Sequence, residues 1–292
     1  MKLVTFTAGD RTRIGVLVAD EIVDLASAAP SLPGNMRDLL EAGPDALAAV
    51  TTAIAGDAPR LPLAAVHLEA PVPNPSKLLA VGRNYSEHLK ETGSKRPEFP
   101  MIFNKQVSSV TGPYDPIVHP HVTEQVDYEG ELAVIIGRRC RYVSQADALG
   151  VVGGYCVIND VSVRDWQRRS PTMTLGKSFD THAPYGPALV TPDEVGDPHD
   201  LSHRTFVNGE KRQDSNTKYF LFNIPEIIET LTSVCTLEPG DVIAMGTCAG
   251  VAIGFDPPKF LKVGDTVRIE FDGLGAIENP VVAEPEGIAR IE

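Results

Sequence analysis

Hydrophobic and polar positions alternate through short stretches of the chain, a pattern typical of β-strands with one buried face. Residues 1–26 contain three such stretches, KLVTFTA, IGVLVAD and EIVDLA, joined by polar turns such as AGDRT. From residue 77 onward, short β-rich runs recur as KLLAVGR, MIFNKQV, ELAVIIG, VVGGYCVIND, GPALVT, RTFVNGEK, DVIAMGT and DTVRIEF. The pattern predicts a protein in which strands dominate.

Helical periodicity is confined to fewer stretches. It is present in NMRDLLEAGPDALAAVTTAIA, with a break at Gly43–Pro44, and DVSVRDWQRRS and IPEIIETLTSVC predict two brief helices further on. Strands and helices do not alternate regularly, so a doubly wound parallel sheet is not expected. The sequence also lacks a G-x-G-x-x-G after a strand and a G-x-x-x-x-G-K-[ST] motif. We expect an α+β fold whose larger part is a strand-rich, mixed β-roll or barrel-like sheet.

A proline-rich segment near residue 72 predicts a domain boundary. The segment LEAPVPNPSK has prolines at Pro71, Pro73 and Pro75, and proline disfavours both helix and ladder pairing. We expect a small N-terminal α/β domain over residues 1–72 and a catalytic domain over residues 73–292. The N-terminal part carries no constellation of catalytic residue types, so we expect it to be structural.

The net charge of the chain makes some classes of binding partner unfavourable. The 292 residues have a formal net charge of −13, which makes nucleic acids and anionic membrane surfaces poor partners. An anionic substrate would need a locally positive pocket.

The N-terminus reads as strand and lacks the apolar core of a signal peptide, and no apolar run reaches the ~20 residues that span a bilayer. The four cysteines show no C-x-x-C spacing. We expect a cytoplasmic protein with reduced thiols.

The strongest chemical signal is an acidic pair in DYEGELAVIIG. Glu129 and Glu131 are two residues apart at the start of an apolar strand, so their side chains point to the same face. Two buried carboxylates repel each other unless a cation lies between them. Asp160, at the end of the apolar run VVGGYCVIN, offers a third oxygen ligand. Carboxylates without His or Cys favour Mg²⁺, Mn²⁺ or Ca²⁺ over Zn²⁺; the alternative is a solvated acidic strand end.

A second constellation lies in VGRNYSEHLKETG. His88 and Glu91 are three residues apart on a predicted helical turn, where the carboxylate can orient the imidazole as a general base. Gly93, Pro97 and Pro100 follow, so the segment could form a mobile lid. An exposed His and Glu on a surface helix is the alternative interpretation.

Further polar residues follow these two groups. Arg164 and Gln167 lie four and seven residues after Asp160, so a helix there would place all three on one face. Lys177 stands in the otherwise uncharged LGKS and could neutralise an oxyanion or enolate; a solvated surface lysine is the alternative interpretation. Thr247 belongs to the glycine-rich turn MGTCAGVAIGF, which could bring backbone N–H groups close to a ligand.

Taken together and in this order, these segments resemble the fumarylacetoacetate hydrolase (FAH) family, in its bacterial type with a small N-terminal domain. The matching elements are GRNYSEHLKE, IFNKQVSSVTGPYDPI, DYEGELAVIIG, YCVINDVSVRDWQ, LGKSFDT and GTCAGVA, which span approximately residues 78–251. The resemblance implies a mixed β-roll catalytic domain and a homodimer. It also implies one divalent ion per subunit, Mg²⁺ or Mn²⁺, held by Glu129, Glu131 and Asp160, and a water-activating dyad of His88 and Glu91 on the lid.

The resemblance also assigns residues around the substrate. Lys177, Arg164 and Gln167 match polar groups near the metal-bound substrate, and Lys105 and Thr247 match further pocket positions. One departure concerns the glycine-rich turn, where Cys248 and Ala252 stand at positions that are often proline and glycine in the family. This leaves the shape of that pocket wall open.

The family acts on 2-oxo acids and 1,3-dicarbonyl compounds. The resemblance and the His88–Glu91 pair favour a metal-dependent hydrolase that cleaves a C–C bond of an acylpyruvate, fumarylpyruvate or diketo sugar acid. Hydroxide would add to the distal carbonyl, and Lys177 would help to hold the resulting pyruvyl enolate. An oxaloacetate decarboxylase or a 2-hydroxy-diene-dioate isomerase would use the same enolate. A non-catalytic metal-binding relative is the remaining alternative.

Overall fold

The computed structural model describes residues 1–91 and 93–287. Its largest sheet has twelve strands, of which ten follow the order β4-β3-β2-β1-β14-β12-β11-β17-β6-β7, while β5 pairs with β1 and β8 with β14. The bounds are β1 Lys2–Ala8, β2 Arg11–Val18, β3 Glu21–Asp24, β4 Arg60–Pro62, β5 His67–Glu69, β6 Leu78–Gly82, β7 Met101–Lys105, β8 Val110–Thr111, β11 Gly130–Ile136, β12 Val152–Asn159, β14 Ala183–Val190 and β17 Val242–Ala244.

A second sheet packs against the first. Its five strands follow the order β16-β15-β18-β19-β9, and β10 and β13 form a separate pair. The bounds are β9 Ile117–His119, β10 Val126–Asp127, β13 Ser162–Val163, β15 Ser202–Val207, β16 Glu210–Asn216, β18 Thr266–Phe271 and β19 Gly275–Ala283. Contacts of β12 with β18 and β19 join the two sheets, and a shared apolar core that includes Leu132, Val157 and Ile269 lies between them.

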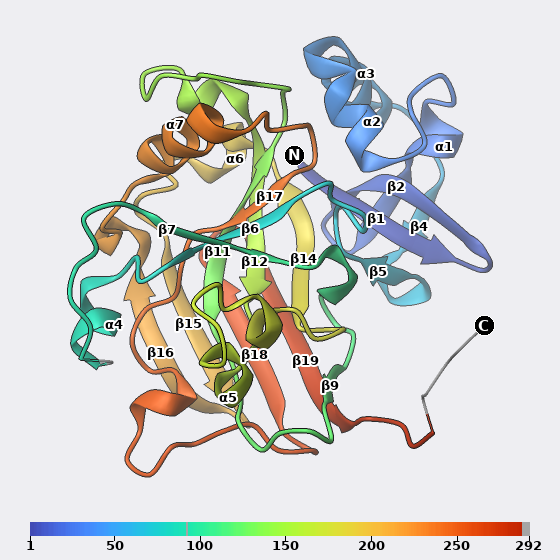
Figure 1. Ribbon diagram of the computed structural model, residues 1–292. Helices are drawn as coiled ribbons and strands as arrows, with labels where there is room; N and C mark the ends of the chain where they lie inside the picture. The colour runs from blue at the N-terminus through green and yellow to red at the C-terminus, as the bar shows by residue number, and fades with distance from the viewer. Residues whose placement is uncertain (92, 288–292) are drawn as a thin grey trace.

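Most helices are short, and Figure 1 shows α1–α3 at the upper right, α6 and α7 at the top left and α4 at the left, while α5 overlies the strands in this view. The helices are α1 Leu25–Ala28, α2 Met36–Glu41, α3 Gly43–Ala55, α4 Ser86–Glu91, α5 Arg164–Gln167, α6 Pro192–Val195 and α7 Ile224–Val234. Short 3₁₀ helices are Leu63–Ala65, Val107–Ser109, Ala148–Val151, Thr174–Lys177, Thr217–Tyr219 and Ala252–Gly254. The predicted break at Gly43 is observed: α2 ends at Glu41, and Gly43 starts α3 with a φ of 77°.

The first 72 residues join the larger part through both sheet and core. β1 pairs antiparallel with β14, so that Lys2 faces Val190. One apolar cluster contains Leu39 and Val50 from α2 and α3 together with Ile158 of β12. Figure 1 shows β1–β5 and α1–α3 grouped at one side of the molecule. The domain boundary at residue 72 stays a prediction.

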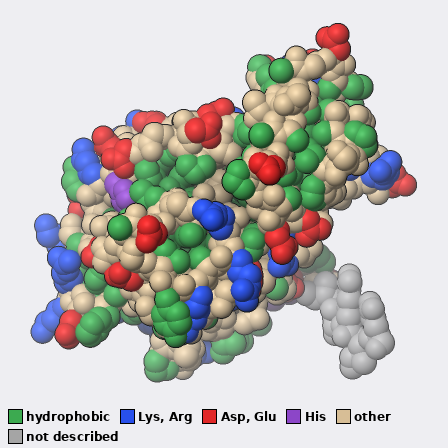
Figure 2. All heavy atoms as spheres, turned by 90° about the horizontal axis from the view of Figure 1, so that it is seen from above, with side chains coloured by type: hydrophobic (Ala, Val, Ile, Leu, Met, Phe, Trp, Pro, Cys, Tyr) green, Lys and Arg blue, Asp and Glu red, His purple; other side chains and the backbone are tan. Residues whose placement is uncertain are grey.

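The predicted fold class is confirmed: the protein is a strand-rich α+β fold. The main sheet has two separate ends, β4 and β7, so in the described part of the chain it does not close into a barrel. No helix among the described residues is long and apolar enough to cross a membrane. Figure 2 shows acidic, basic and hydrophobic side chains interspersed over the face seen from above.

Candidate metal centre and active site

Two neighbouring strands bring the acidic residues together. β11 pairs antiparallel with β12, and Gly130 lies opposite Asn159. The ladder continues past the strand ends, because the Asp160 N–H donates to the Glu129 carbonyl over 2.9 Å. Asp160 therefore lies beside the Glu129–Glu131 pair, although it comes 29 positions after Glu131 in the sequence.

The three carboxylates form a set that fits a divalent cation. One oxygen from each of Glu129, Glu131 and Asp160 lies within 4.8 Å of the others, and all three residues are buried. Carboxylate oxygens are ligands that Mg²⁺ and Mn²⁺ prefer. Burial makes uncompensated like charges costly, so the donor set and its surroundings both favour a bound cation.

Three buried cations contact these carboxylates. Lys177 Nζ donates to Glu129 Oε2 and Asp160 Oδ2, each at 2.6 Å. Lys105 Nζ donates to Asp160 Oδ1 over 2.7 Å, and Arg164 Nη2 donates to Glu129 Oε1 over 2.6 Å. Every carboxylate oxygen of Glu129 and Asp160 thus has a charged donor.

Asp127 adds a fourth buried carboxylate to the cluster. It accepts from Arg164 Nε over 2.8 Å and from the backbone N–H of Ala252 over 2.7 Å. Four buried carboxylates therefore face three buried cations, which leaves one net negative charge when all are ionised. A divalent cation would reverse that sign and make the centre attractive to an anionic substrate.

The surroundings shift the pKa values of Glu131 and Glu129 in opposite directions. Burial, together with the charges of Asp160 and Glu129, raises the pKa of Glu131 well above its usual range. Burial also acts to raise the pKa of Glu129, but Lys177 and Arg164 outweigh it and hold that pKa low. Burial acts to lower the pKa of Lys177, yet the charges of Asp160 and Glu129 keep it above the ordinary value. Glu129 and Lys177 are therefore held in their charged forms.

The glycine-rich turn after β17 closes one side of the centre. The Gly246 N–H donates to Glu131 Oε2 over 2.6 Å. Gly246 has a φ of 92°, and a Cβ there would lie 2.7 Å from the Val81 carbonyl, so glycine is required. Thr247 Oγ1 donates to the Gly130 carbonyl over 3.0 Å, which ties the turn to β11.

Helix α4 carries the predicted dyad to the same place. His88 Nδ1 and Glu91 Oε2 are 3.2 Å apart, and Glu91 Oε1 accepts from the Gly250 N–H over 2.8 Å. A Cβ on Gly254 would meet Glu91 at 2.2 Å, so the carboxylate packs closely against the glycine-rich segment. The Glu91 side chain is thus fixed at both oxygens and can hold the His88 ring in one orientation.

These groups surround one cavity of about 430 Å³. Seven of the ten predicted site residues line it: His88, Glu129, Glu131, Arg164, Gln167, Lys177 and Thr247. The other three lie behind its wall, with Glu91 against His88, Asp160 against Lys177, and Lys105 against Asp160. The structure thus brings all ten residues to one place, while their roles stay proposals.

One expectation about this region is wrong. Asp160, Arg164 and Gln167 do not share a helical face, because α5 begins only at Arg164 and the short strand β13 precedes it. The pairing of β13 with β10 extends the chain after Asp160. Arg164 still reaches the centre, and its Nη1 donates to Gln167 Oε1 over 3.0 Å.

Sequence reasoning missed several residues of the site. Asp127 forms a D-x-E-x-E pattern with the two glutamates, and this spacing could have revealed it. Gln213, on β16, donates to Thr247 Oγ1 over 2.8 Å and accepts from the Gly130 N–H over 3.0 Å, a connection that no local pattern indicates. Arg83 and Arg168 also line the cavity.

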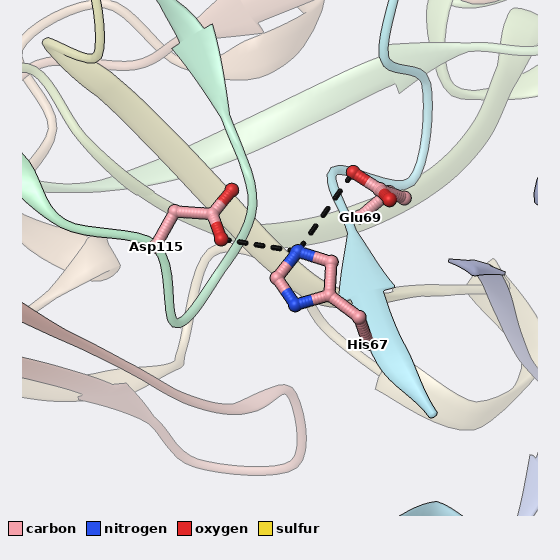
Figure 3. Close-up of side chains that lie close together, drawn as sticks. All are labelled: His67, Glu69 and Asp115. Carbon is pink, nitrogen blue, oxygen red and sulfur yellow. Dashed lines mark ion pairs between the residues drawn. The ribbon is translucent and has the colours of Figure 1, made fainter. Parts of the chain in front are cut away.

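A second group of potential ligands lies away from this cavity, at the junction of β5 with the segment after β8 (Figure 3). His67 Nε2 is 3.1 Å from Asp115 Oδ1 and 4.0 Å from Glu69 Oε2. The His67 side chain is 52% exposed. When His67 is protonated, its ion pair with Asp115 joins the N-terminal part to the larger part, and Glu69 lies beside it within the N-terminal part. Exposed ion pairs account for this group without a metal.

Comparison with known proteins places the chain in a family. Residues 77–282 match the model of the fumarylacetoacetate (FAA) hydrolase C-terminal domain. The chain belongs to this family, as its motifs indicated.

Relatives of this chain include oxaloacetate tautomerases. It is 44% identical over 288 residues to the mitochondrial oxaloacetate tautomerase fahd2 of Xenopus laevis, covering 97% of this chain and 90% of the relative. It is 40% identical over 301 residues to the oxaloacetate tautomerase YisK of Bacillus subtilis, covering 96% and 100%.

Solved structures extend the range of chemistry. A fumarylacetoacetate hydrolase from Exiguobacterium antarcticum has a TM-score of 0.85 at 38% identity, covering 97% of this chain and 100% of that chain. A maleylpyruvate hydrolase from Sphingobium sp. SYK-6, in complex with manganese(II) ion and pyruvate, has a TM-score of 0.83 at 36% identity, covering 98% and 100%. The chain is thus an enzyme of a family whose members act on small organic acids, and the manganese complex together with the acidic triad points to a divalent metal.

Proposed function

We propose that the protein is a metal-dependent tautomerase that interconverts the keto and enol forms of oxaloacetate or a closely related 2-oxo acid. The observation that carries the proposal is the convergence of His88, Lys177 and the acidic triad at one cavity. A base, a cation and a divalent-metal site are what proton abstraction next to a carbonyl needs. The oxaloacetate tautomerases among the relatives support this reaction.

Glu129, Glu131 and Asp160 would hold the ion, and Mg²⁺ or Mn²⁺ fits their oxygen ligands. When bound, the ion supplies a Lewis acid that stabilises negative charge on the 2-oxo group. Lys105 and Arg164 position two of the ligand carboxylates through the hydrogen bonds described above. Side chains that line the cavity would move the proton and balance the charge that develops on the substrate.

His88 is proposed to carry the proton. The Nδ1–H group donates to Glu91, and Nε2 takes the proton from C3 of the keto acid. The electrons of the broken C–H bond move to the 2-oxo oxygen, where the ammonium of Lys177 balances the charge. A proton from solvent water adds to that oxygen and gives the enol, while the imidazolium of His88 returns its proton to the solvent. The reverse sequence gives the keto form, and no bond between heavy atoms is broken.

The decay of the enol's ultraviolet absorbance tests this proposal. Purified protein with Mn²⁺ should accelerate the approach to keto–enol equilibrium, and EDTA should abolish the acceleration. His88→Gln should lower the rate by about 10²- to 10⁴-fold, the usual contribution of a general base. An unchanged rate in His88→Gln would remove His88 from the mechanism, and no acceleration by the wild type would refute the function.

Hydrolysis of an acylpyruvate is the second candidate, and the His88–Glu91 pair favours it because the same base could activate water. Incubation with acetylpyruvate distinguishes the two functions. Pyruvate and acetate released in equal amounts would identify the hydrolase. Carbon dioxide formed from oxaloacetate faster than the uncatalysed reaction would identify the decarboxylase. We also propose that the protein forms a homodimer, from the family resemblance, and that it is cytoplasmic, from its sequence.

A further inference from the structure

Two arginines of the cavity wall lie outside the metal centre. Arg83 follows β6 directly, and Arg168 follows α5; both line the cavity together with His88 and Lys177. Arg83 and Arg168 are exposed residues, whereas Arg164 and Lys177 are buried. The cavity therefore has a buried end at the carboxylates and a more open end that carries guanidinium groups.

The guanidinium groups at the open end have no acidic partner. In the described part of the chain, the Arg83 guanidinium has no hydrogen bond or ion pair, and the Arg168 guanidinium donates only to the neutral Gln125 side chain, over 2.9 Å. Acidic residues outnumber basic ones in the chain, 39 to 26, yet neither of these two guanidinium groups pairs with a carboxylate in the described part of the chain. The positive charge at this end remains available to a ligand.

The backbone of Arg83 adopts an energetically costly conformation. Arg83 has a φ of 58°, a left-handed conformation that glycine or asparagine adopts at lower cost. The neighbouring Asn84 fixes the turn, since its side chain donates to the carbonyls of Phe222 and Met245 at 3.1 and 2.8 Å. A costly backbone at a fixed turn beside a cavity is common where a side chain has a function.

We propose that Arg83, assisted by Arg168, binds the second carboxylate of the substrate and so selects 2-oxo dicarboxylates over 2-oxo monocarboxylates. A guanidinium binds a carboxylate through two parallel hydrogen bonds. A four-carbon 2-oxo diacid presents one carboxylate at each end, and the metal centre accounts for only one of them. This inference rests on the proposed function and adds a substrate class to it.

The test compares the selectivity of variants for two substrates that both enolise, oxaloacetate and phenylpyruvate. The measured quantity is the ratio of kcat/KM for oxaloacetate to kcat/KM for phenylpyruvate. Arg83→Gln should lower this ratio by about 10- to 100-fold, the loss expected when a charge-assisted hydrogen-bonded pair is removed. The change should lie mainly in KM for oxaloacetate, because the chemistry occurs at the other end of the cavity. Arg168→Gln should produce a smaller decrease.

Arg169→Gln is the matched control. Arg169 is the exposed neighbour of Arg168, but its guanidinium lies over the Trp166 ring, 3.6 Å from the centroid, and it is not part of the cavity wall. Its selectivity ratio should equal that of the wild type. Arg83→Gly serves as a second variant, because it relieves the left-handed backbone; it should fold at least as stably as the wild type and still lose selectivity.

The outcomes separate this inference from the proposed function. If Arg83→Gln lowers kcat/KM equally for both substrates, or lowers it for neither, the ratio does not change. That result would overturn the role of Arg83 while tautomerisation stands. If the wild type turns over neither substrate, the proposed function fails, and calorimetry with the Mn²⁺-loaded protein decides the inference. In that case 3,3-difluorooxaloacetate should bind more tightly than pyruvate to the wild type, and Arg83→Gln should remove the preference. Equal binding of both acids to the wild type would overturn the inference.

Discussion

Lys177 determines much of the charge balance at the metal centre. Its ammonium contacts one oxygen of Glu129 and one of Asp160, at 2.6 Å each. The same two carboxylates are proposed ligands of the divalent ion, so the lysine and the ion share them. Lys177 therefore reduces the repulsion among the carboxylates before any metal binds, and it stays beside the metal and substrate afterwards.

Replacing Lys177 should make the stability of the fold depend more strongly on bound metal. Lys177→Met leaves two buried carboxylates short of a cation, and loss of one partner of a buried pair typically costs about 3–5 kcal/mol. The free energy of unfolding of the metal-free variant should fall by that order, and Mn²⁺ should raise its melting temperature more than it raises that of the wild type. Differential scanning calorimetry with EDTA or Mn²⁺ measures both effects.

Lys211→Met is the control for this change. Lys211 is half-exposed and pairs with Asp214 at the surface, so its loss should cost less than about 1 kcal/mol. Equal destabilisation in the two variants, or an equal response to Mn²⁺, would show that Lys177 does not compensate the buried carboxylates.

Single residues of the site were predictable to different degrees. The alternation of strand side chains placed Glu129 and Glu131 on one face, and the abrupt end of an apolar run indicated Asp160. Arg83 was not found, because its identity as a cavity residue depends on a left-handed turn that no sequence periodicity reveals. Gln213 was not found because β16 reaches the centre only through tertiary packing.

Among the elements, the strands were easier to predict than α5. β11 and β12 are buried along nearly their whole length and appear in the sequence as continuous apolar runs. α5 has only four residues, which is too short for a 3.6-residue period to become visible. The pairing of β13 with β10 then overrode the helix expected from Asp160 onward.

The glycine-rich turn after β17 offers a test at this scale. Gly246→Ala places a Cβ 2.7 Å from the Val81 carbonyl and should displace the N–H group that holds Glu131. We expect a loss of free energy of unfolding greater than the ~1–2 kcal/mol of a left-handed alanine alone, together with weaker Mn²⁺ binding. Chemical denaturation and calorimetric Mn²⁺ titration measure these two quantities.

Gly264→Ala separates the backbone cost from the steric one. Gly264 has a φ of 96°, close to the 92° of Gly246, but a Cβ there meets no atom within 4 Å. This variant should lose only the cost of the left-handed backbone and should bind Mn²⁺ as the wild type does. If Gly246→Ala matches it in both measurements, the close approach of the turn to β6 does not matter for the centre.

At the scale of the whole molecule, long-range strand pairing organises the fold. β1 pairs with β14, nearly 190 residues later in the chain, and β6 lies parallel to β17. The sequence indicated the fold class through the number of short strands and the motifs of the family, but not the order of the strands. Strand order depends on side-chain packing between distant segments, which a local pattern does not contain.

Burial of histidines within this fold predicts how its stability depends on pH. His203, on β15, stacks on Phe271 with ring centroids 4.5 Å apart and lies 3.2 Å from the Tyr85 hydroxyl. Burial, partly opposed by the charge of Asp214, lowers the pKa of His203 to about 4. In the unfolded chain the pKa is about 6.5, so between these values the unfolded state binds a proton that the folded state does not. The stability contributed by neutral His203 is therefore complete above about pH 6.5 and is lost as the pH falls towards 4.

His203→Gln should remove this dependence. Between pH 6.5 and about 4, the free energy of unfolding of the wild type should fall by about 1.4 kcal/mol per pH unit more than that of the variant. The comparison uses urea unfolding followed by circular dichroism at pH 7.5, 6.0 and 5.0. The variant is expected to be less stable than the wild type at pH 7.5, because glutamine loses the stacking on Phe271, and the difference should narrow as the pH falls. Parallel curves for the two proteins would mean that His203 is protonated in the folded state as readily as in the unfolded chain, which its burial between the two sheets argues against.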